Sequence, residues 1–297
     1  MGYKIGMRII RIGLLLLIAF LVFAFTGCME RLAYMPMRGT PAPDSDSIEE
    51  VWFESPEGLR LHGWFFHVPD GPDISLESDA APPTILVAHG NAGNVSHHAG
   101  FVEFLARDGF QVLLFDYRSY GNSDRGRLRR QYLYRDTQAA LDYLMQRPDV
   151  DPTRLGVYGQ SLGGVFASRL AAAHPEIRAV VIVSAFSSWQ EIAASAVGGA
   201  EPGGFSRWLA RMLMPAGLDP IDSLTGLTDG RPVLLVHGTD DEVVPYAHGL
   251  RLRDAALRAG VNLTFRSVVG GDHNSLQRID PTLDQTITSF LRSAFAD

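Results

Sequence analysis

At the centre of the chain stands Gly159-Gln160-Ser161-Leu162-Gly163-Gly164. A short apolar run, residues 154–158, precedes it, and residues 165–173 after it have the composition of a helix. A strand, a sharp turn containing G-x-S-x-G and a helix together make the nucleophile-elbow pattern. Small residues flank the serine because the strained turn requires the strand and the helix to pass closely. The pattern predicts a nucleophile at Ser161, and an ordinary glycine-rich turn is the alternative.

Composition places the chain among folded globular proteins. It has 297 residues, of which 46% are hydrophobic and 20% are charged, which suits one large domain or two small ones. The formal net charge of -7 argues against a nucleic-acid partner. Cys28 is the only cysteine, which excludes an internal disulfide and a cysteine-rich metal site. We expect no metal and no cofactor, because His89, His97 and His98 form no coherent set of ligands.

Residues 1–28 predict an export signal. Three basic residues come first, and residues 12–25 follow as an apolar run that only Gly13 interrupts. This run is short for a membrane-spanning helix, which needs roughly 20 apolar residues. Phe25-Thr26-Gly27-Cys28 resembles the bacterial lipobox, in which the cysteine is lipidated, with Phe25 standing where that motif prefers leucine. We therefore expect lipid on Cys28 and a membrane-anchored domain outside the cytoplasm. An uncleaved membrane anchor is the alternative.

The order of apolar runs along the chain predicts the fold. Residues 29–47 have the composition of a tether, and two strands at 49–54 and 59–68 predict an antiparallel hairpin. From residue 85 onward, short apolar runs typical of strands buried on both faces alternate with helical segments. The fold class is therefore α/β over residues 48–297, with a doubly wound, mostly parallel sheet led by the hairpin. In such sheets ligands bind at the carboxyl ends of the strands.

The alternation of strand and helix patterns is interrupted between residues 187 and 222. Glycines and prolines interrupt this segment, and tryptophan, phenylalanine and methionine side chains give it an apolar character. We expect either a small lid over the site or one more packing helix with a loop. Aromatic and methionine side chains beside the site favour a lipid-type substrate.

A serine nucleophile needs a histidine base and a carboxylate that orients the base. In this fold the three follow in the order serine, acid, histidine. The chain has nine histidines. Those before the serine, those in or beside helices, and His237, which precedes the candidate acids, do not fit this order. His273 remains as the candidate base. The acid should follow the strand at 233–236, and spacing alone does not choose among Asp240, Asp241 and Glu242. His237 itself is predicted to be a buried structural histidine that hydrogen-bonds this loop.

The oxyanion of acyl transfer needs backbone donors. Leu162 follows the serine and supplies the first N–H, at the N-terminus of the predicted helix. The second donor is expected from the loop His89-Gly90-Asn91-Ala92-Gly93-Asn94, whose small residues let its backbone approach the serine. We predict the N–H of Asn91, with that of Ala92 as the alternative.

Five motifs in register resemble the α/β-hydrolase superfamily. They are the elbow and the loops at 89–94, 116–123, 237–245 and 271–274. They are most similar to the membrane-associated single-domain branch, which includes protein depalmitoylases, lysophospholipid hydrolases and many bacterial hydrolases. The resemblance covers residues 30–295, and its His-Gly-x-x-Asp pattern puts the acid at Asp241. It also implies structural roles for Asp116 and Arg118, while Ser119 stands where that branch usually has glycine.

These patterns predict a serine hydrolase of carboxylic esters or thioesters, acting on acyl lipids or small acyl compounds. The catalytic residues would be Ser161, His273 and Asp241, working through an acyl-enzyme. The sequence leaves the oligomeric state open. One alternative is a serine peptidase or aminopeptidase of the same fold. The other is a non-catalytic envelope lipoprotein that binds lipid or protein, which the complete triad argues against.

Overall fold

The computed structural model describes residues 28–69 and 81–296. The predicted export signal therefore lies outside the described residues, apart from Cys28, which begins helix α2 (Cys28–Arg31). Across these two described ranges, no helix is both long enough and apolar enough to cross a membrane.

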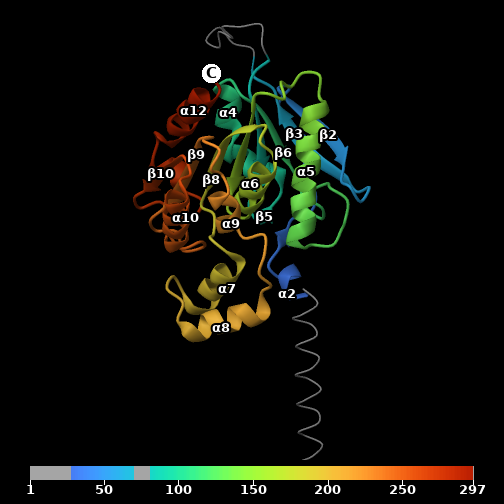
Figure 1. Ribbon diagram of the computed structural model, residues 1–297. Coiled ribbons are helices and arrows are strands. Elements are labelled where there is room, and N and C mark those ends of the chain that lie inside the picture. Colours follow the sequence, from blue (N-terminus) through green and yellow to red (C-terminus); the bar gives the residue numbers. More distant parts are fainter. Residues whose placement is uncertain (1–27, 70–80, 297) are drawn as a thin grey trace, which may run out of the picture.

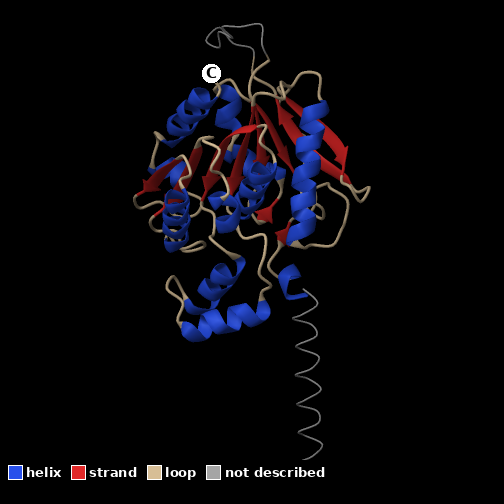
Figure 2. Ribbon diagram, viewed as in Figure 1, coloured by secondary structure: helices blue, strands red, loops and turns tan. Residues whose placement is uncertain are grey.

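An eight-stranded sheet forms the centre of the molecule, in the order β10-β9-β8-β7-β4-β6-β3-β2 (Figure 1 and Figure 2). Strands β2 and β3 pair antiparallel, β3 joins β6 antiparallel, and all later pairs are parallel. This confirms the predicted α/β sheet led by an antiparallel hairpin. The bounds are β2 (Ile48–Glu54), β3 (Arg60–Phe66), β4 (Thr84–Ala88), β6 (Gln111–Phe115), β7 (Leu155–Gln160), β8 (Ile177–Val183), β9 (Val233–Gly238) and β10 (Leu263–Val268).

Helices cover both faces of the sheet, which explains the continuous apolar runs of its central strands. Every residue of β4, β6, β7 and β9 is buried, whereas the edge strand β2 alternates between buried and accessible positions. One face packs against α5 (Arg130–Gln146), α6 (Leu162–Ala173), α9 (Pro220–Thr225) and α10 (Ala247–Ala259). The other packs against α3 (Val95–His98), η1 (Ala99–Phe101), α4 (Glu103–Arg107), α11 (Leu276–Ile279) and α12 (Leu283–Ala294).

Two helices stand beyond the carboxyl ends of the strands, in the segment where a lid was one of two expectations. They are α7 (Trp189–Gly198) and α8 (Gly204–Leu213), and they pack on each other apart from the sheet (Figure 1). Helix α9 begins at Pro220 and packs on α6 and α10, so it belongs to the main body. We call residues 187–219 the lid.

Residues 30–40 pack against the domain, so the prediction of a tether over 29–47 was wrong for this part. Tyr34 and Thr40 are buried, and β1 (Met35–Pro36) pairs in parallel with β5 (Ala92–Gly93). The prolines and polar residues that suggested a tether begin after this segment, and residues 41, 42, 44 and 45 are exposed. The contacts of residues 30–40 are with loops far away in the sequence, which local composition does not reveal.

Candidate active site

Ser161 lies in the sharp turn between β7 and α6. Its backbone has φ 53° and ψ -115°, a left-handed conformation that is costly for a residue with a side chain. The turn is enforced by close packing, because a Cβ on Gly163 would lie 1.8 Å from the carbonyl oxygen of Ala88 in β4. Ser161 is only 9% exposed, but it lines the cavity described below. The elbow predicted from the sequence is therefore formed.

Asp241 and His273 meet across two loops, which follow β9 and β10. The Nδ1 atom of His273 lies 2.8 Å from Oδ2 of Asp241, and the other carboxylate oxygen accepts the N–H groups of Val243 (3.0 Å) and Val244 (2.8 Å). Asp240 instead points into solvent, where its carboxylate accepts the hydroxyl of Thr239. The structure therefore brings Asp241, and not Asp240, to the predicted base.

The carboxylate of Asp241 is buried yet kept ionised. Burial raises its pKa, but the hydrogen bonds from His237 and His273 outweigh burial and hold the pKa of Asp241 below its ordinary value. His237 is fully buried, and its Nε2 donates to the carbonyl of Val244 at 2.8 Å. It thus fixes the acid loop, as predicted for a structural histidine.

His273 is oriented for proton transfer through its second nitrogen. Because Nδ1 is taken by Asp241, Nε2 is the atom available to the serine. Within the described residues, His273 Nε2 and the Ser161 hydroxyl form no direct hydrogen bond. Such bonds commonly tighten only when substrate is bound.

The residues that carry the two predicted oxyanion donors, Leu162 and Asn91, line one cavity together with Ser161. Leu162 is the first residue of α6, so its N–H has no partner within the helix and lies at the positive end of the helix dipole. The side chain of Asn91 turns away from the serine, because its Nδ2 donates to the carbonyl of Ala33 at 2.6 Å. The carbonyl of Asn91 accepts the hydroxyl of Tyr120 at 2.8 Å. These bonds fix the loop in which the backbone N–H of Asn91 lies.

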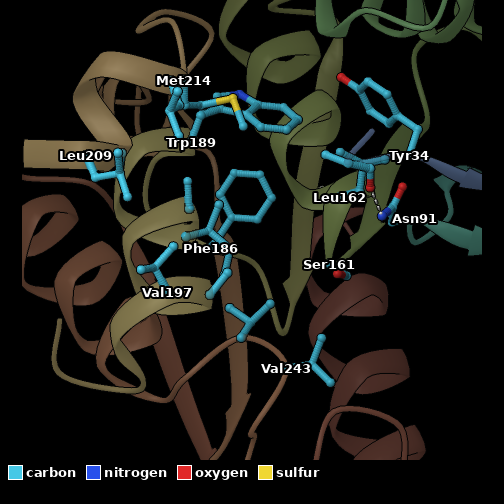
Figure 3. Close-up of a pocket in the computed structure, with 17 residues that line it drawn as sticks. Tyr34, Asn91, Ser161, Leu162, Phe186, Trp189, Val197, Leu209, Met214 and Val243 are labelled. Atoms are coloured by element: carbon cyan, nitrogen blue, oxygen red, sulfur yellow. Dashed lines mark hydrogen bonds between the residues drawn. The ribbon is translucent and has the colours of Figure 1, made fainter. Parts of the chain in front are cut away.

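An apolar cavity of about 350 Å³ begins at Ser161 and extends beneath the lid. Figure 3 shows Ser161, Leu162 and Asn91 on one side of this cavity and the lid side chains on the other. The edge-to-face pair of Phe186 and Trp189, with ring centroids 5.0 Å apart, forms part of its wall. The lining residues are Ala33, Tyr34, Asn91, Ser161, Leu162, Phe186, Trp189, Ile192, Ala193, Ala196, Val197, Leu209, Ala210, Leu213, Met214, Val243 and Val244.

Comparison with known families agrees with this geometry. A sequence model of the prolyl oligopeptidase family, a peptidase family, matches residues 98–297. The chain belongs to the prolyl oligopeptidase family. The matched part contains Ser161, Asp241 and His273, whereas the loop at 89–94 precedes it. The chain is thus a serine hydrolase of the α/β fold.

Relatives of the chain extend the match toward the N-terminus. The uncharacterized protein YfhR of Escherichia coli O157:H7 is 36% identical over 245 residues, covering 82% of this chain and 80% of YfhR. The α/β-hydrolase domain-containing protein WAV2 of Arabidopsis thaliana is 31% identical, covering 88% of this chain and 83% of WAV2. An esterase from Pyrococcus furiosus shares the fold, with a TM-score of 0.68 at 19% identity over 87% of this chain and 98% of the esterase.

The loop at 116–123 has the structural role that the resemblance implied. Asp116 accepts the N–H of Val95 at 2.9 Å and the hydroxyl of Thr40 at 2.8 Å. Arg118 is buried, and its guanidinium contacts the carboxylates of Asp136 and Glu57. Ser119 has φ 69°, which explains why glycine is usual at this position of the pattern.

Three contributions to the site were not predicted from the sequence. Ala33 and Tyr34 line the cavity from a segment expected to be a tether. His248 reaches the lid from α10, because its Nδ1 accepts the N–H of Ser187 at 3.1 Å. No local sequence pattern marks Ala33 and Tyr34 as site residues. Their place becomes evident only in the fold, where Glu30 bonds both Tyr34 and Arg130. In the part of the chain that the structure describes, no group of three or more His, Cys, Asp or Glu is placed to hold a metal ion.

Proposed function

We propose that the chain hydrolyses carboxylic esters or thioesters whose acyl part is apolar, such as acyl lipids or small acyl compounds. The observation that carries this proposal is the cavity beneath the lid. It begins at Ser161, and the side chains that line it include no charged group. An apolar acyl chain is the ligand that such a lining stabilises, because burial of its methylene groups is favourable and leaves no polar atom unpaired.

The proposed reaction proceeds in two halves. Ser161 Oγ attacks the acyl carbon while His273 takes the hydroxyl proton, and Asp241 stabilises the imidazolium. The N–H groups of Leu162 and Asn91 hold the oxyanion. The carbon–oxygen or carbon–sulfur bond then breaks as His273 returns the proton to the leaving group. Water repeats the sequence on the acyl-enzyme, which releases the acid and restores Ser161.

A serine peptidase is the second candidate, and the family description favours it. A free amino terminus or an extended peptide needs charged or hydrogen-bonding groups beside the nucleophile. The described residues lining the cavity supply few such groups, namely the side chains of Tyr34, Asn91, Ser161 and Trp189, and the indole N–H of Trp189 is bonded to the carbonyl of Leu218. The lining therefore supports an acyl ester or thioester over a peptide.

We also propose that the enzyme works at a membrane surface, outside the cytoplasm, with lipid on Cys28. The lid carries an exposed apolar stripe on one face of α8, formed by Phe205 (70% exposed), Trp208 (56%) and Met212 (43%). Helices α8 and α2 lie at the same end of the molecule (Figure 1). Amphipathic helices with such a stripe bind in the plane of a lipid interface.

Flotation of the full chain with vesicles of phosphatidylethanolamine and phosphatidylglycerol tests the membrane surface. In a Cys28→Ala background we expect a Phe205→Ser/Trp208→Ser variant to float less than its parent. Leu257→Ser is the matched control, because Leu257 is also exposed but lies on α10. Equal flotation of all three proteins would argue against a role for α8.

A substrate panel tests the chemistry. It contains nitrophenyl esters of increasing chain length, lysophospholipids, acyl thioesters and aminoacyl amides. We expect turnover of esters or thioesters that improves as the acyl chain lengthens. Turnover of amides alone would establish the peptidase. No turnover of any compound by folded protein would favour a lipoprotein that only binds.

A further inference from the structure

Residues 30–40, which we call the strap, follow the predicted lipid anchor in the chain and contribute Ala33 and Tyr34 to the lining of the cavity. The strap begins two residues after Cys28 and ends at Thr40. Along this length it contacts both the loop that carries Asn91 and the lid. The family match does not include it, because that match begins at residue 98.

The strap holds the oxyanion loop, residues 89–94, through both its backbone and its side chains. Asn91 donates to the carbonyl of Ala33 at 2.6 Å and accepts the N–H of Met35 at 3.3 Å. The N–H of Met37 donates to the carbonyl of Gly93 at 3.0 Å, next to the β1–β5 pairing. The loop that supplies the second oxyanion donor is therefore bonded to the strap on one side.

The strap also forms one wall of the cavity. Tyr34 is 6% exposed and lines the cavity together with Ala33. Its ring meets that of Trp189 on lid helix α7 edge to face, with centroids 6.3 Å apart. Its hydroxyl donates to the carboxylate of Glu30 at 2.9 Å, so the ring is held in place from within the strap.

Buried Arg130 joins the strap to the lid. Its backbone N–H and its Nε both donate to Oε1 of Glu30, at the N-terminus of α5. Its Nη1 donates to the carbonyls of Pro215 and Gly217, each at 2.9 Å, in the segment where the lid returns to the main body. Its guanidinium carbon lies 4.2 Å from the centre of the Trp189 ring. One cation thus fixes both walls of the cavity.

The C-terminal end of the strap is also fixed by hydrogen bonds. Thr40 donates its hydroxyl to Asp116 at 2.8 Å, and its backbone N–H bonds Asn122 at 3.0 Å. Gly121 donates its N–H to the carbonyl of Met37 at 2.8 Å. Since both ends are fixed, the section between them, with Ala33, Tyr34 and Met35, has a defined position over the site.

We propose that the strap is a positioning element of the active site with two separable effects. Through Tyr34 it completes the acyl subsite and sets the preference for long chains. Through Asn91 it holds the oxyanion loop and thereby sets the rate for every substrate. The inference rests on the proposed function. It further implies that the membrane-proximal segment of the chain is part of the catalytic domain.

The acyl-subsite effect is tested with Tyr34→Ala and Tyr34→Phe in the full chain. For decanoyl nitrophenyl ester we expect Tyr34→Ala to raise KM about tenfold, because apolar contact is lost. Its kinetics on the acetyl ester should stay within about twofold. Tyr34→Phe keeps the ring but loses the bond to Glu30, so its KM for the decanoyl ester should rise less than that of Tyr34→Ala. Equal losses on both esters, or no loss on either, would overturn the acyl-subsite role.

The oxyanion-loop effect is tested with Asn91→Ala, which removes the side-chain bonds to the strap but keeps the backbone N–H. We expect kcat to fall at least about tenfold on short and long esters alike, with little change in KM. Asn262→Ala is the matched control, because Asn262 is exposed and bonds the carbonyl of Gly230 just before β10 begins, at the end of the sheet opposite the carboxyl ends of the parallel strands. Unchanged kcat in Asn91→Ala, with the Tm of the wild type, would overturn this role.

A second measurement tests the role of the strap independently of the proposed substrate class. The rate of Ser161 labelling by a fluorophosphonate requires the oxyanion donors but no acyl chain. The labelling rate should fall in Asn91→Ala and should stay near that of the wild type in Tyr34→Ala. If the wild type hydrolyses no ester, the proposed function fails, while the labelling rates still decide whether the strap positions the loop.

Discussion

The Nδ1 atom of His273 lies 2.8 Å from Oδ2 of Asp241, on loops 32 residues apart in the chain. Because the carboxylate also accepts two backbone N–H groups, it holds the imidazole in one orientation and one tautomer. We therefore expect Asp241→Asn to lower kcat on a nitrophenyl ester by about 10⁴-fold while the fold is kept. Steady-state kinetics, with circular dichroism as the folding control, measure this.

The neighbouring carboxylate provides the matched comparison. Asp240 is exposed and bonds only the hydroxyl of Thr239 among the described side chains. Asp240→Asn should leave kcat within about threefold of the wild type, since a surface charge near a site has a small effect. An inactive Asp240→Asn beside an active Asp241→Asn would reverse the assignment.

The elbow depends on the close approach of α6 to β4. A Cβ on Gly163 would lie 1.8 Å from the carbonyl oxygen of Ala88, and backbone on both sides leaves nothing that can move aside. Gly163→Ala should destabilise the protein by about 1–3 kcal/mol or more and abolish activity. Gly100→Ala is the control, because a Cβ there meets nothing within 4 Å. Urea unfolding of both variants measures the difference, and equal midpoints would contradict this packing.

Much of the site was predictable from the sequence because its chemistry restricts the residue types. In this fold the triad follows the chain order serine, acid, histidine, so Ser161 and His273 followed from the pattern. Spacing in the sequence did not distinguish Asp240 from Asp241 as the catalytic acid, because adjacent residues on a loop differ only in the direction in which their side chains point. The resemblance chose Asp241, and the structure gives the reason in its bonds to the N–H groups of Val243 and Val244.

The strap and the wall of the cavity were not predictable by the same means. Tyr34 and Arg130 are far apart in the chain, and neither belongs to a motif. Their contact arises because α5 begins where the strap passes, a relationship that exists only in the folded protein. For residues 187–219, the break in the strand and helix pattern marked the segment but left open whether it packs over the site.

His248, which bonds the first residue of the lid, makes the stability of the protein depend on pH. It is fully buried, accepts the N–H of Ser187, and lies 3.3 Å from the hydroxyl of Ser195 on α7. Burial, with smaller effects from Arg251 and His237, lowers its pKa to about 3, whereas an unfolded histidine has a pKa of about 6.5. The unfolded chain therefore binds a proton that the native protein excludes. This stabilisation is present above pH 6.5 and is lost as the pH falls toward 3.

His248→Asn removes that proton while leaving a side-chain oxygen to accept the N–H of Ser187. We expect the free energy of unfolding to depend less on pH in the variant, by up to about 1.4 kcal/mol per pH unit between pH 6 and 4. Urea unfolding at several pH values measures the slope. Leu257→Ser, at an exposed side chain that does not titrate, should keep the slope of the wild type. Parallel slopes for His248→Asn and wild type would show that His248 is not the group responsible.

The size of the cavity should determine the chain length that the enzyme accepts. Ala193 lines the cavity from α7, so Ala193→Phe fills space that an acyl chain would occupy. We expect kcat/KM for decanoyl nitrophenyl ester to fall about 10- to 100-fold, with the acetyl ester within about threefold. Ala200→Phe, at an exposed position between α7 and α8, is the control. A uniform effect on all chain lengths would place the acyl chain elsewhere.

The central claim is that Ser161 is the nucleophile of a serine hydrolase. Its most direct test is the covalent labelling of purified protein by a fluorophosphonate, followed by mass spectrometry of the peptides. We expect one adduct, on Ser161, and none on Ser161→Ala protein of the same Tm. Equal labelling of both proteins, or an adduct on another residue, would contradict it.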